Sequence, residues 1–550
     1  MSAPITSACS RTACPSNGSS RIPYRRHLKE GDAARTSIPR TASPSFPVFC
    51  LAALTLAAFA VRAAGLHHQS FWLDEVDAIA MARAPLDEQL RRFGQIGENG
   101  PLYFLLLRFW LAAAGESEYG LRFLSAACST LAVPVSAALV RALLNLDALR
   151  TPATEPAGSQ SLLSRGQRGL PLLTAALVAF SPCLVWYAQD GKMYALYLLL
   201  TLAVQYSFVR GWQQGAGGPW LVYVIAGAVL PYIHLFGALV LVANVIAGLA
   251  LWPGWPHGRR AYMLATTALV LPYVPLAGWQ KEVLLRGADV GHRPVDAAGA
   301  ALALLEQFTL HLPWRPPATA WLPFALLALA GFWALRGRPA TQILVLAWLF
   351  VPFAGTLALQ GRVPVFRDRY LTPMLVPFLV LVAAGVLGLL FTRSRGYAVP
   401  MRPVWRTGNI LSGLVLAGYV AAAWGYALAH RPPNADFRAA AALVRALAGP
   451  EDQIGFLAGY AERPFAWYYD APYRRVDLPY TNYPGMSEHE GLRAVASAVR
   501  WSPSLWVVRW EDWMWDSRDL TGQWLRMRGR LVLERRFAGG VTVTRYELAQ

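Results

Sequence analysis

The stretch Ser70-Phe71-Trp72-Leu73-Asp74-Glu75 directly follows an apolar run, Pro47 to Leu66, that is long enough to cross a bilayer. The same segment closes with Gly97-Glu98-Asn99-Gly100-Pro101-Leu102-Tyr103. Between these ends, acidic residues gather in an otherwise apolar chain: Asp74, Glu75, Asp77, Asp87, Glu88 and Glu98. Acids concentrated at one boundary between water and lipid indicate chemistry at that boundary.

The composition is that of a multi-span membrane protein. Of the 550 residues, 55% are hydrophobic and only 15% are charged, whereas soluble domains carry about 25% charged residues. The mean hydropathy is +0.33. The net charge of +18 comes from Lys and Arg residues that fall largely in short loops between apolar runs. That placement is typical of orientation signals, so we expect no nucleic-acid partner.

The apolar runs predict an all-α polytopic membrane domain at 46–428. It follows a basic tail at 1–45, which is too polar to fold and is expected to be disordered and cytoplasmic. About eleven transmembrane helices are expected, at roughly 48–66, 119–144, 170–188, 193–210, 219–235, 236–252, 261–279, 319–335, 340–360, 370–391 and 407–428. The cysteines (Cys9, Cys14, Cys50, Cys128 and Cys183) have no zinc-like spacing, and we expect no structural disulfide.

Alternate threading of these runs places the basic inter-helix loops on the cytoplasmic side. The threading requires that Leu102–Ala114, which is short and carries Arg108, lies in the outer interface and does not cross. The polar segments at the other helix ends then share the outer side: 67–100, 189–192, His234, 280–318 and 362–369. A site built from several loops is therefore expected to face the periplasm or cell exterior, with the protein in the cell (inner) membrane.

Residues 429–550 predict a C-terminal extracytoplasmic α/β domain. Helices are expected at 436–448 and 492–499, and strands at 453–457, 505–510, 531–537 and 541–548. The domain is rich in aromatic residues: Phe465, Trp467, Tyr468, Tyr469, Tyr473, Tyr480 and Tyr483. These rings fit a core, a sugar-stacking surface or a contact with the membrane face, and a core is the default interpretation.

The acidic pair Asp74-Glu75 lies just beyond the first apolar run and beside Trp72. A pair of acids in such a position often only caps a helix in water. Partial desolvation next to Trp72 can, however, raise the basicity of a carboxylate. Such a carboxylate is suited to remove the proton from an acceptor hydroxyl.

The motif Trp72-Leu73-Asp74-Glu75 resembles the acidic signature of integral-membrane glycosyltransferases of the GT-C fold, of the family 39 type. Protein O-mannosyltransferase-like and lipid A aminoarabinose transferase-like enzymes are the nearest groups. Four further segments are similar to family elements in order and spacing: 98–103, 118–123, 187–196 and 367–373. Relatives often carry His or Lys where Asn99-Gly100 stand, and Arg where this chain has Lys192. The resemblance covers roughly residues 48–400.

The resemblance implies a hexosyl- or pentosyltransferase that moves a sugar from a polyprenyl-phosphate carrier to an extracytoplasmic lipid, glycan or protein, with inversion. It implies Asp74 as catalytic base, with Glu75 and Glu98 orienting it or the acceptor. Cations suited to the carrier phosphate are Lys192, Arg367, Arg369 and Arg122. Substrate-binding roles fall to Asn99, Tyr103, Tyr187, Gln189, Asp190 and Tyr370.

Two other functional classes fit the same motifs. A transporter or flippase of lipid-linked sugars would bind the same headgroup, but it would carry ionisable groups near mid-membrane, where the apolar runs have almost no acids. A non-catalytic partner in a cell-envelope complex would tolerate loss of Asp74. A divalent metal held by Glu98 with His292 or His311 is possible, but no spacing demands it. His234 is typical of a packing residue.

Overall fold

The structure is a computed structural model, and the residues it describes lie within the range 46–549. The described residues are 46–93, 100–148, 160–215, 217–254, 258–287, 294–309, 319–391, 413–415, 417–422, 425, 434–499 and 503–549. The predicted disordered tail, residues 1–45, lies outside them.

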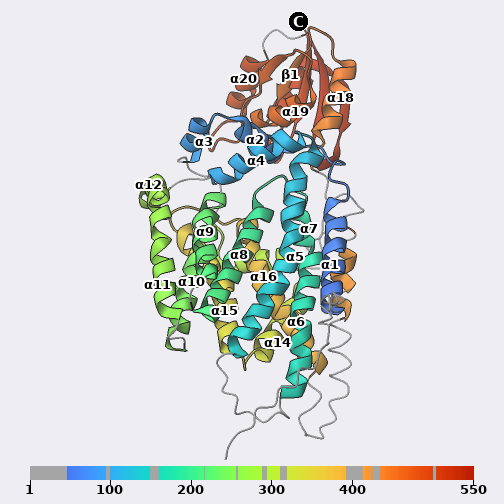
Figure 1. Ribbon diagram of the computed structural model, residues 1–550. Helices are drawn as coiled ribbons and strands as arrows, with labels where there is room; N and C mark the ends of the chain where they lie inside the picture. The colour runs from blue at the N-terminus through green and yellow to red at the C-terminus, as the bar shows by residue number, and fades with distance from the viewer. Residues whose placement is uncertain are drawn as a thin grey trace, which may run out of the picture. The chain divides into compact units, whose positions relative to one another are not determined.

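Apolar helices form a bundle in which most run side by side (Figure 1). They are α1 (Phe46–Ala63), α5 (Glu118–Ala148), α6 (Gln160–Phe180), α7 (Pro182–Ala188), α8 (Tyr194–Gln214), α9 (Gly218–Ile233), α10 (Gly237–Leu251), α11 (Arg259–Ala268), α12 (Val270–Arg286), α13 (Ala297–Phe308), α14 (Leu322–Ala334), α15 (Pro339–Gln360) and α16 (Leu375–Phe391). Two 3-10 helices join it, η1 (Trp252–Gly254) and η3 (Asp368–Met374). Ten of the eleven predicted apolar runs coincide with helices, and most of the last, 407–428, lies outside the described residues.

Five helices in the described part of the chain are long and apolar enough to cross a membrane. A sixth span results if α6 and α7, which are bent by 55° at Ser181, count as one. The others, including α1, α9 and α14, are apolar but shorter. The polytopic helical domain predicted from the sequence is therefore confirmed, whereas the number of crossings and their sidedness stay predictions.

Glycines let two of these helices approach closely. A Cβ on Gly331 of α14 would lie 1.8 Å from the carbonyl oxygen of Leu381 in α16, and one on Gly385 would lie 2.0 Å from that of Leu327. No side chain fits between the two backbones at these points. Small residues at helix contacts are how membrane helices gain packing contacts where lipid supplies no hydrophobic driving force.

Arg62, near the end of α1, is completely buried where α6 gives way to α7. Its guanidinium donates hydrogen bonds to the carbonyl oxygens of Val178 (3.0 Å) and Ala179 (2.6 Å) and to Ser129 Oγ (2.9 Å). The last carbonyls of a helix have no partner inside it. Arg62 therefore supplies hydrogen-bond donors to the unpaired carbonyl oxygens at the end of α6, where the chain bends.

Three short helices lie at one end of the bundle: α2 (Leu73–Arg83), α3 (Leu86–Phe93) and α4 (Pro101–Ala114) (Figure 1). The helix predicted at Leu102–Ala114 is thus present as α4. It begins at Gly100, where a Cβ would lie 1.8 Å from the carbonyl oxygen of Tyr232 in α9. That close approach fixes α4 against the bundle, beside the acidic start of α2.

The C-terminal segment forms an α/β domain, as predicted. Its elements are α18 (Phe437–Leu447), β1 (Gln453–Phe456), η4 (Gly459–Ala461), α19 (Glu462–Tyr468), β2 (Arg474–Asp477), α20 (Glu488–Ala498), β3 (Ser504–Arg509), α21 (Asp512–Trp515), α22 (Leu520–Arg528), β4 (Gly529–Arg536), η5 (Ala538–Gly540) and β5 (Thr542–Leu548). The strand order is β2-β1-β3-β5-β4, with β2, β1 and β3 parallel and the last two pairings antiparallel.

Helices cover both faces of this sheet because the side chains of its strands alternate. In β3, Trp506 and Val508 pack with α18 and α19, whereas Leu505 and Val507 pack with α20 and α22. The predicted helices and strands of this domain are all present. Four α-helices and strands were not predicted, α19, β2, α21 and α22, nor were the two 3-10 helices η4 and η5.

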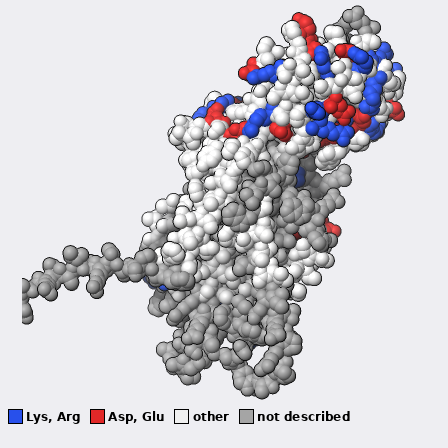
Figure 2. Space-filling model, turned by 90° about the vertical axis from the view of Figure 1, so that its right-hand side faces the viewer, with Lys and Arg blue, Asp and Glu red and all other residues white. Residues whose placement is uncertain are grey.

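Charged side chains are distributed unevenly over the surface. In Figure 2 they gather on the C-terminal domain and on the neighbouring short helices, and the visible described surface of the bundle is almost without them. Its exposed side chains include Leu264, Leu271 and Trp333, which are 65–75% exposed. An apolar belt of this kind is what lipid requires, and it identifies the bundle as a membrane domain.

Candidate active site

Three segments that are far apart in the sequence meet at the start of α2. Arg369, in η3, has Nη1 3.2 Å from Oδ2 of Asp74. The backbone N–H of Gly191, in the turn between α7 and α8, donates to Oε1 of Glu75 at 2.9 Å. Trp72 Nε1 donates to Oδ1 of Asp190 at 3.3 Å. The structure thus brings together the first loop, the 189–192 turn and the 367–370 segment, which the sequence placed on one side.

Glu75 and Arg122 form a buried ion pair. Both carboxylate oxygens of Glu75 accept from Arg122, at 2.7 Å from Nε and 2.6 Å from Nη2. The side chains are 0% and 2% exposed. Parallel bonds of this kind match the planar fork of a guanidinium to a carboxylate and fix both groups.

Arg122 uses its remaining N–H groups on the loop before α2. Nη1 donates to the carbonyl oxygens of Leu66 and Gln69, and Nη2 also donates to that of Ser70. All five N–H groups therefore have acceptors within the protein. Arg122 and Glu75 hold the loop in place, which agrees with an orienting role for Glu75. The carrier-phosphate role predicted for Arg122 stays a prediction, and it would require these bonds to break.

Asp74 and Arg369 form a second ion pair, which is only partly buried. Their side chains are 27% and 28% exposed. The guanidinium of Arg369 also lies over the rings of Tyr194 (5.8 Å) and Tyr370 (5.7 Å). Its Nε is buried and has no hydrogen-bond partner among the described residues. A carboxylate and a cation are thus held side by side with access to solvent.

The other predicted cations differ in their surroundings. Lys192 is half-buried, and in the described part of the chain its ammonium has no hydrogen bond or ion pair, while its carbonyl oxygen accepts from Ser125 Oγ at 3.1 Å. Arg367 is exposed just before η3. Among the described residues, Lys192 is thus an unpaired cation that directly follows the Asp190-Gly191 turn.

Several predicted substrate-binding residues hold the turn in place. Gln189 Nε2 donates to the carbonyl oxygens of Val61 and Arg62 at the end of α1 and to that of Ala64 just beyond it. Tyr103 Oη donates to the carbonyl oxygen of Gly191 at 2.9 Å, and Tyr187 Oη accepts from Gln307 at 2.9 Å. A Cβ on Gly191 would lie 2.5 Å from Leu121 Cδ2. These contacts pack the turn tightly against Glu75, and substrate contact by these residues stays a prediction.

Sequence reasoning missed an aromatic group under Arg369. Tyr194 underlies the guanidinium, and His234, completely buried, stacks on Tyr197 with centroids 4.7 Å apart and lies 5.0 Å from Tyr370. The Nε2 of His234 has no partner among the described residues. In the sequence, the only indication of this group was His234 near the end of an apolar run, and a lone histidine there is more typical of a packing residue than of a ligand-binding one.

The C-terminal domain contacts the loop that precedes Asp74. Tyr468 Oη accepts from the backbone N–H of Phe71 (2.7 Å) and donates to Glu118 (2.6 Å). Arg438 reaches the same Glu118 oxygen at 2.5 Å, and Ser70 Oγ donates to the carbonyl oxygen of Ala435 at 2.8 Å. Burial raises the pKa of Tyr468, and the hydrogen bond to Glu118 raises it further. The sequence offered no signal for this contact because it joins residues about 350 positions apart.

Two predicted site residues, Glu98 and Asn99, lie outside the described residues, as do the candidate metal ligands His292 and His311. Within the described ranges, no three His, Cys, Asp or Glu side chains converge as metal ligands would. Cys50, Cys128 and Cys183 are free thiols. The arrangement of Asp74, Arg369 and Lys192 suits a proton transfer beside a bound anion.

Comparisons with known proteins bear on the fold. No protein-family model matches the chain, and no curated protein matches it in sequence. Among solved structures, ArnT from Cupriavidus metallidurans in the apo state is 14% identical, with a TM-score of 0.51, over 90% of this chain and 97% of that one. The structure of the same protein bound to undecaprenyl phosphate is 12% identical, with a TM-score of 0.45, over 90% of this chain and 97% of that one.

The Archaeoglobus fulgidus oligosaccharyltransferase tethered with an acceptor peptide is 11% identical with a TM-score of 0.47, over 92% of this chain and 74% of that one. Of these three structures, apo ArnT alone reaches a TM-score above 0.5. The likeness concerns the arrangement of the helices together with the C-terminal domain, since it extends over nearly the whole of both chains. The chain therefore has the fold of the GT-C membrane glycosyltransferases, as the motif order predicted.

Proposed function

We propose that this protein is a glycosyltransferase that moves a sugar from a polyprenyl-phosphate carrier to an acceptor outside the cytoplasm, with inversion. The observation that carries the proposal is the partly exposed pair of Asp74 and Arg369, 3.2 Å apart, at the meeting point of three segments. The GT-C fold supports it. Transfer from a lipid phosphate needs a base and a cation that both reach solvent at the membrane surface.

In the proposed reaction, the acceptor hydroxyl attacks the anomeric carbon from the face opposite the phosphate. Asp74 takes the hydroxyl proton as the new carbon–oxygen bond forms. The bond from the anomeric carbon to the phosphate oxygen breaks, and its electron pair leaves with the polyprenyl phosphate. Attack from the opposite face inverts the anomeric centre. Because phosphate leaves as a stable anion, it needs cations near its oxygens more than it needs a proton.

Arg369 has two partners available in this scheme. Without a carrier it pairs with Asp74, and its Nε remains without an acceptor. A phosphate that binds Arg369 and Lys192 competes for the same cation and weakens the pair. A nearby positive charge stabilises the ionised carboxylate and makes it a weaker base. When Arg369 turns to the phosphate, Asp74 loses that stabilisation and becomes a better proton acceptor. Carrier binding and activation of the base are coupled through one side chain.

Glu98 remains a candidate to orient the acceptor, with or without a divalent ion. The transfer assay should therefore be run with Mg²⁺ or Mn²⁺ and with EDTA. A loss of activity in EDTA that either metal restores would assign a metal to the reaction.

The deciding experiment measures transfer from a synthetic polyprenyl-phosphate sugar by the purified full-length protein. Asp74→Asn keeps the size and most hydrogen bonding of the side chain but cannot take the proton. We expect folding and carrier binding to survive while turnover falls by about 10²-fold or more. Asp77→Asn, on the same helix and paired with Arg463 at 2.6 Å, is the matched control and should keep its turnover.

Full activity in Asp74→Asn would refute its role as base. Carrier binding without transfer by the parent protein, over several sugars and acceptors, would favour the transporter or flippase instead. A cell-envelope function that survives Asp74→Asn in the absence of any transfer or transport would favour the non-catalytic partner.

A further inference from the structure

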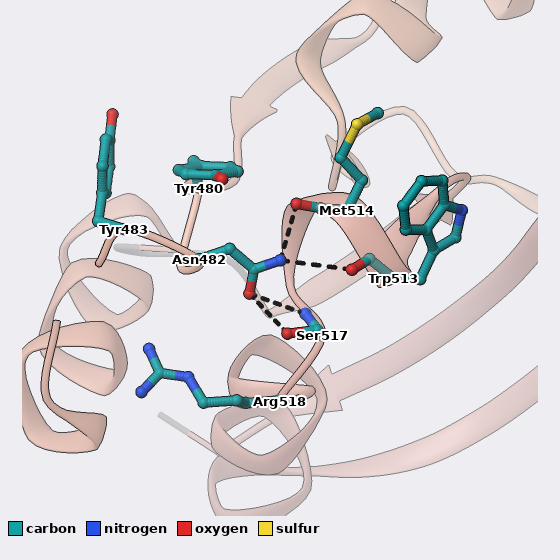
Figure 3. A pocket seen from close by; sticks show the side chains of 7 residues that line it. All are labelled: Tyr480, Asn482, Tyr483, Trp513, Met514, Ser517 and Arg518. Atoms are coloured by element: carbon teal, nitrogen blue, oxygen red, sulfur yellow. Dashed lines mark hydrogen bonds between the residues drawn. The ribbon is translucent and has the colours of Figure 1, made fainter. Parts of the chain in front are cut away.

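A hollow of ≈ 480 Å³ opens on the surface of the C-terminal domain. Its lining includes Tyr480, Asn482, Tyr483, Trp513, Ser517 and Arg518, from the segment before α20 and from α21 and the turn after it. Figure 3 shows Tyr483 and Trp513 on opposite sides of the hollow, with Tyr480 and Asn482 between them and Arg518 below. None of these residues belongs to the Asp74 site.

The aromatic rings of the hollow are unusually open to water. Trp513 is 71% exposed and Tyr483 is 58% exposed, whereas Phe465 and Tyr469 of the same domain are buried in its core. Tyr480 and Tyr483 meet edge to face, with centroids 4.7 Å apart and planes at 86°. Two exposed faces of large rigid rings, set across one hollow, offer a ligand contact area at little cost in side-chain entropy.

Hydrogen bonds to the backbone fix the segments that carry these rings. Asn482 Nδ2 donates to the carbonyl oxygen of Met514 (2.7 Å), and its Oδ1 accepts from the backbone N–H (3.0 Å) and the hydroxyl (2.9 Å) of Ser517. Arg518 donates to the carbonyl oxygens of Met486 (2.9 Å) and Thr481 (2.7 Å). The two sides of the hollow are therefore tied together before any ligand binds.

The backbone around Trp513 is strained. Glu511 (φ 53°) and Asp519 (φ 51°) are the non-glycine residues with positive φ in the described chain, and they stand on either side of the segment 512–518. Residues other than glycine adopt this backbone conformation at a cost in free energy, and such positions cluster at binding and catalytic sites. Trp513, which is exposed, lies between these two positions.

We propose that this hollow is a carbohydrate-binding site. A sugar ring has apolar C–H faces and a rim of hydroxyls, so it needs a flat aromatic surface together with hydrogen-bonding groups at the edge. Trp513 and Tyr483 supply the surface, and the guanidinium of Arg518 and the phenol groups supply the edge. The side chains that line the hollow include one cation and no carboxylate, which favours chains that contain an acidic sugar.

The site lies on the domain whose α19 and α18 contact the loop before Asp74. A glycan bound there is held by the same protein that carries the transfer site. Its role as the holder of a glycan acceptor rests on the proposed transferase function, but the binding itself does not.

The test is isothermal titration of the full-length protein in detergent with two probes, a galacturonic acid tetramer and an N-acetylglucosamine tetramer. We expect the parent to bind, with the acidic tetramer bound more tightly. Trp513→Ala and Tyr483→Ala should each weaken binding at least tenfold. Arg518→Met should remove the preference for the acidic tetramer. Arg530→Met and Met527→Ala, exposed elsewhere on the same domain, are the matched controls and should bind as the parent does.

Binding of neither tetramer by the parent would overturn the proposal, as would parental affinity in both Trp513→Ala and Tyr483→Ala. Trp513→Phe keeps an aromatic face and should retain part of the affinity, which separates loss of stacking from loss of folding. Asp74→Asn should bind both tetramers like the parent whatever its turnover. Failure of the transferase proposal and failure of the carbohydrate site are thus told apart.

Discussion

Asp74 and Glu75 are neighbours in the sequence, and each is paired with an arginine from a distant helix, yet the two pairs differ in exposure. The pair of Glu75 and Arg122 is closed to water, and every N–H of the arginine has a protein acceptor. The pair of Asp74 and Arg369 is more than a quarter exposed and has one bond at 3.2 Å. The difference separates a structural role from a chemical one.

The physical reason lies in what each pair would lose on meeting a substrate. A buried pair with no spare donor cannot take a new partner without exposing an uncompensated charge. A partly open pair can exchange one partner for another at small cost, because water screens the intermediate state. One residue of an acidic signature therefore holds the loop, and the adjacent residue is left free to react.

The largest effect on stability is expected from breaking the closed pair. Glu75→Gln leaves Arg122 buried without a countercharge, and we expect a loss of about 3–5 kcal/mol in the free energy of unfolding. Thermal unfolding of the protein in detergent measures it. Asp74→Asn is the control and should unfold close to the parental temperature. Equal losses in the two variants would erase the distinction between the pairs.

The open pair should show its largest effect in turnover. Arg369→Met removes the cation beside the reacting groups, and we expect transition-state stabilisation to fall by about 2–4 kcal/mol, the range for one preorganised donor. Lys192→Met should also lower turnover. The comparison of kcat/KM with the unfolding temperature sharpens the contrast, since activity should fall while stability holds. Near-parental turnover in both variants would show that the carrier phosphate does not bind at Arg369 and Lys192.

A smaller effect is expected where the C-terminal domain supports the loop. Tyr468→Phe removes the hydroxyl that accepts from Phe71 N–H and donates to Glu118, and we expect a loss of about 1–2 kcal/mol in unfolding free energy. Thermal unfolding checks this value. No change at all would mean that the Tyr468 hydroxyl contributes nothing to holding the loop before Asp74.

The smallest effect is expected at an exposed ion pair between α19 and α2. Arg463 and Asp77 are 57% and 35% exposed, and Arg463→Ala should change the unfolding free energy by about 0–1 kcal/mol. A salt titration provides the check, because the contribution should vanish as ionic strength rises. A loss as large as that of Glu75→Gln would show that exposure does not rank these pairs.

Much of the fold could be predicted because its signals are local. Long apolar runs specify helices, and a short continuous apolar run such as Leu505 to Val508 specifies a strand with two buried faces. The strand β2 gave no such signal, since Val476 is its one buried residue at the edge of the sheet. The helix α19 escaped prediction because it is only seven residues long and its aromatic side chains fit several structures.

The candidate site was predictable in its parts but not in its pairings. The residue types and their common side followed from motif order and from the positions of the basic loops. Which arginine meets which acid depends on how helices pack, as the contact of Arg369 with Asp74 across 295 positions illustrates. The exposure of each carboxylate decides whether it orients the loop or reacts, and the sequence of Asp74 and Glu75 does not reveal which of the two is exposed.

Arg62 has a bearing on how the chain is assembled in the membrane. Its acceptors at the end of α6 lie about 117 positions further along, so they do not exist when α1 is first synthesised. An unpartnered arginine at the centre of a membrane helix costs about 2.5–3.5 kcal/mol, and one near a helix end, such as Arg62, can avoid this cost by keeping its charge at the membrane surface. We therefore expect α1 to reach its final depth only after α6 and α7 have entered the bilayer, so that α1 settles later than helices that are synthesised after it.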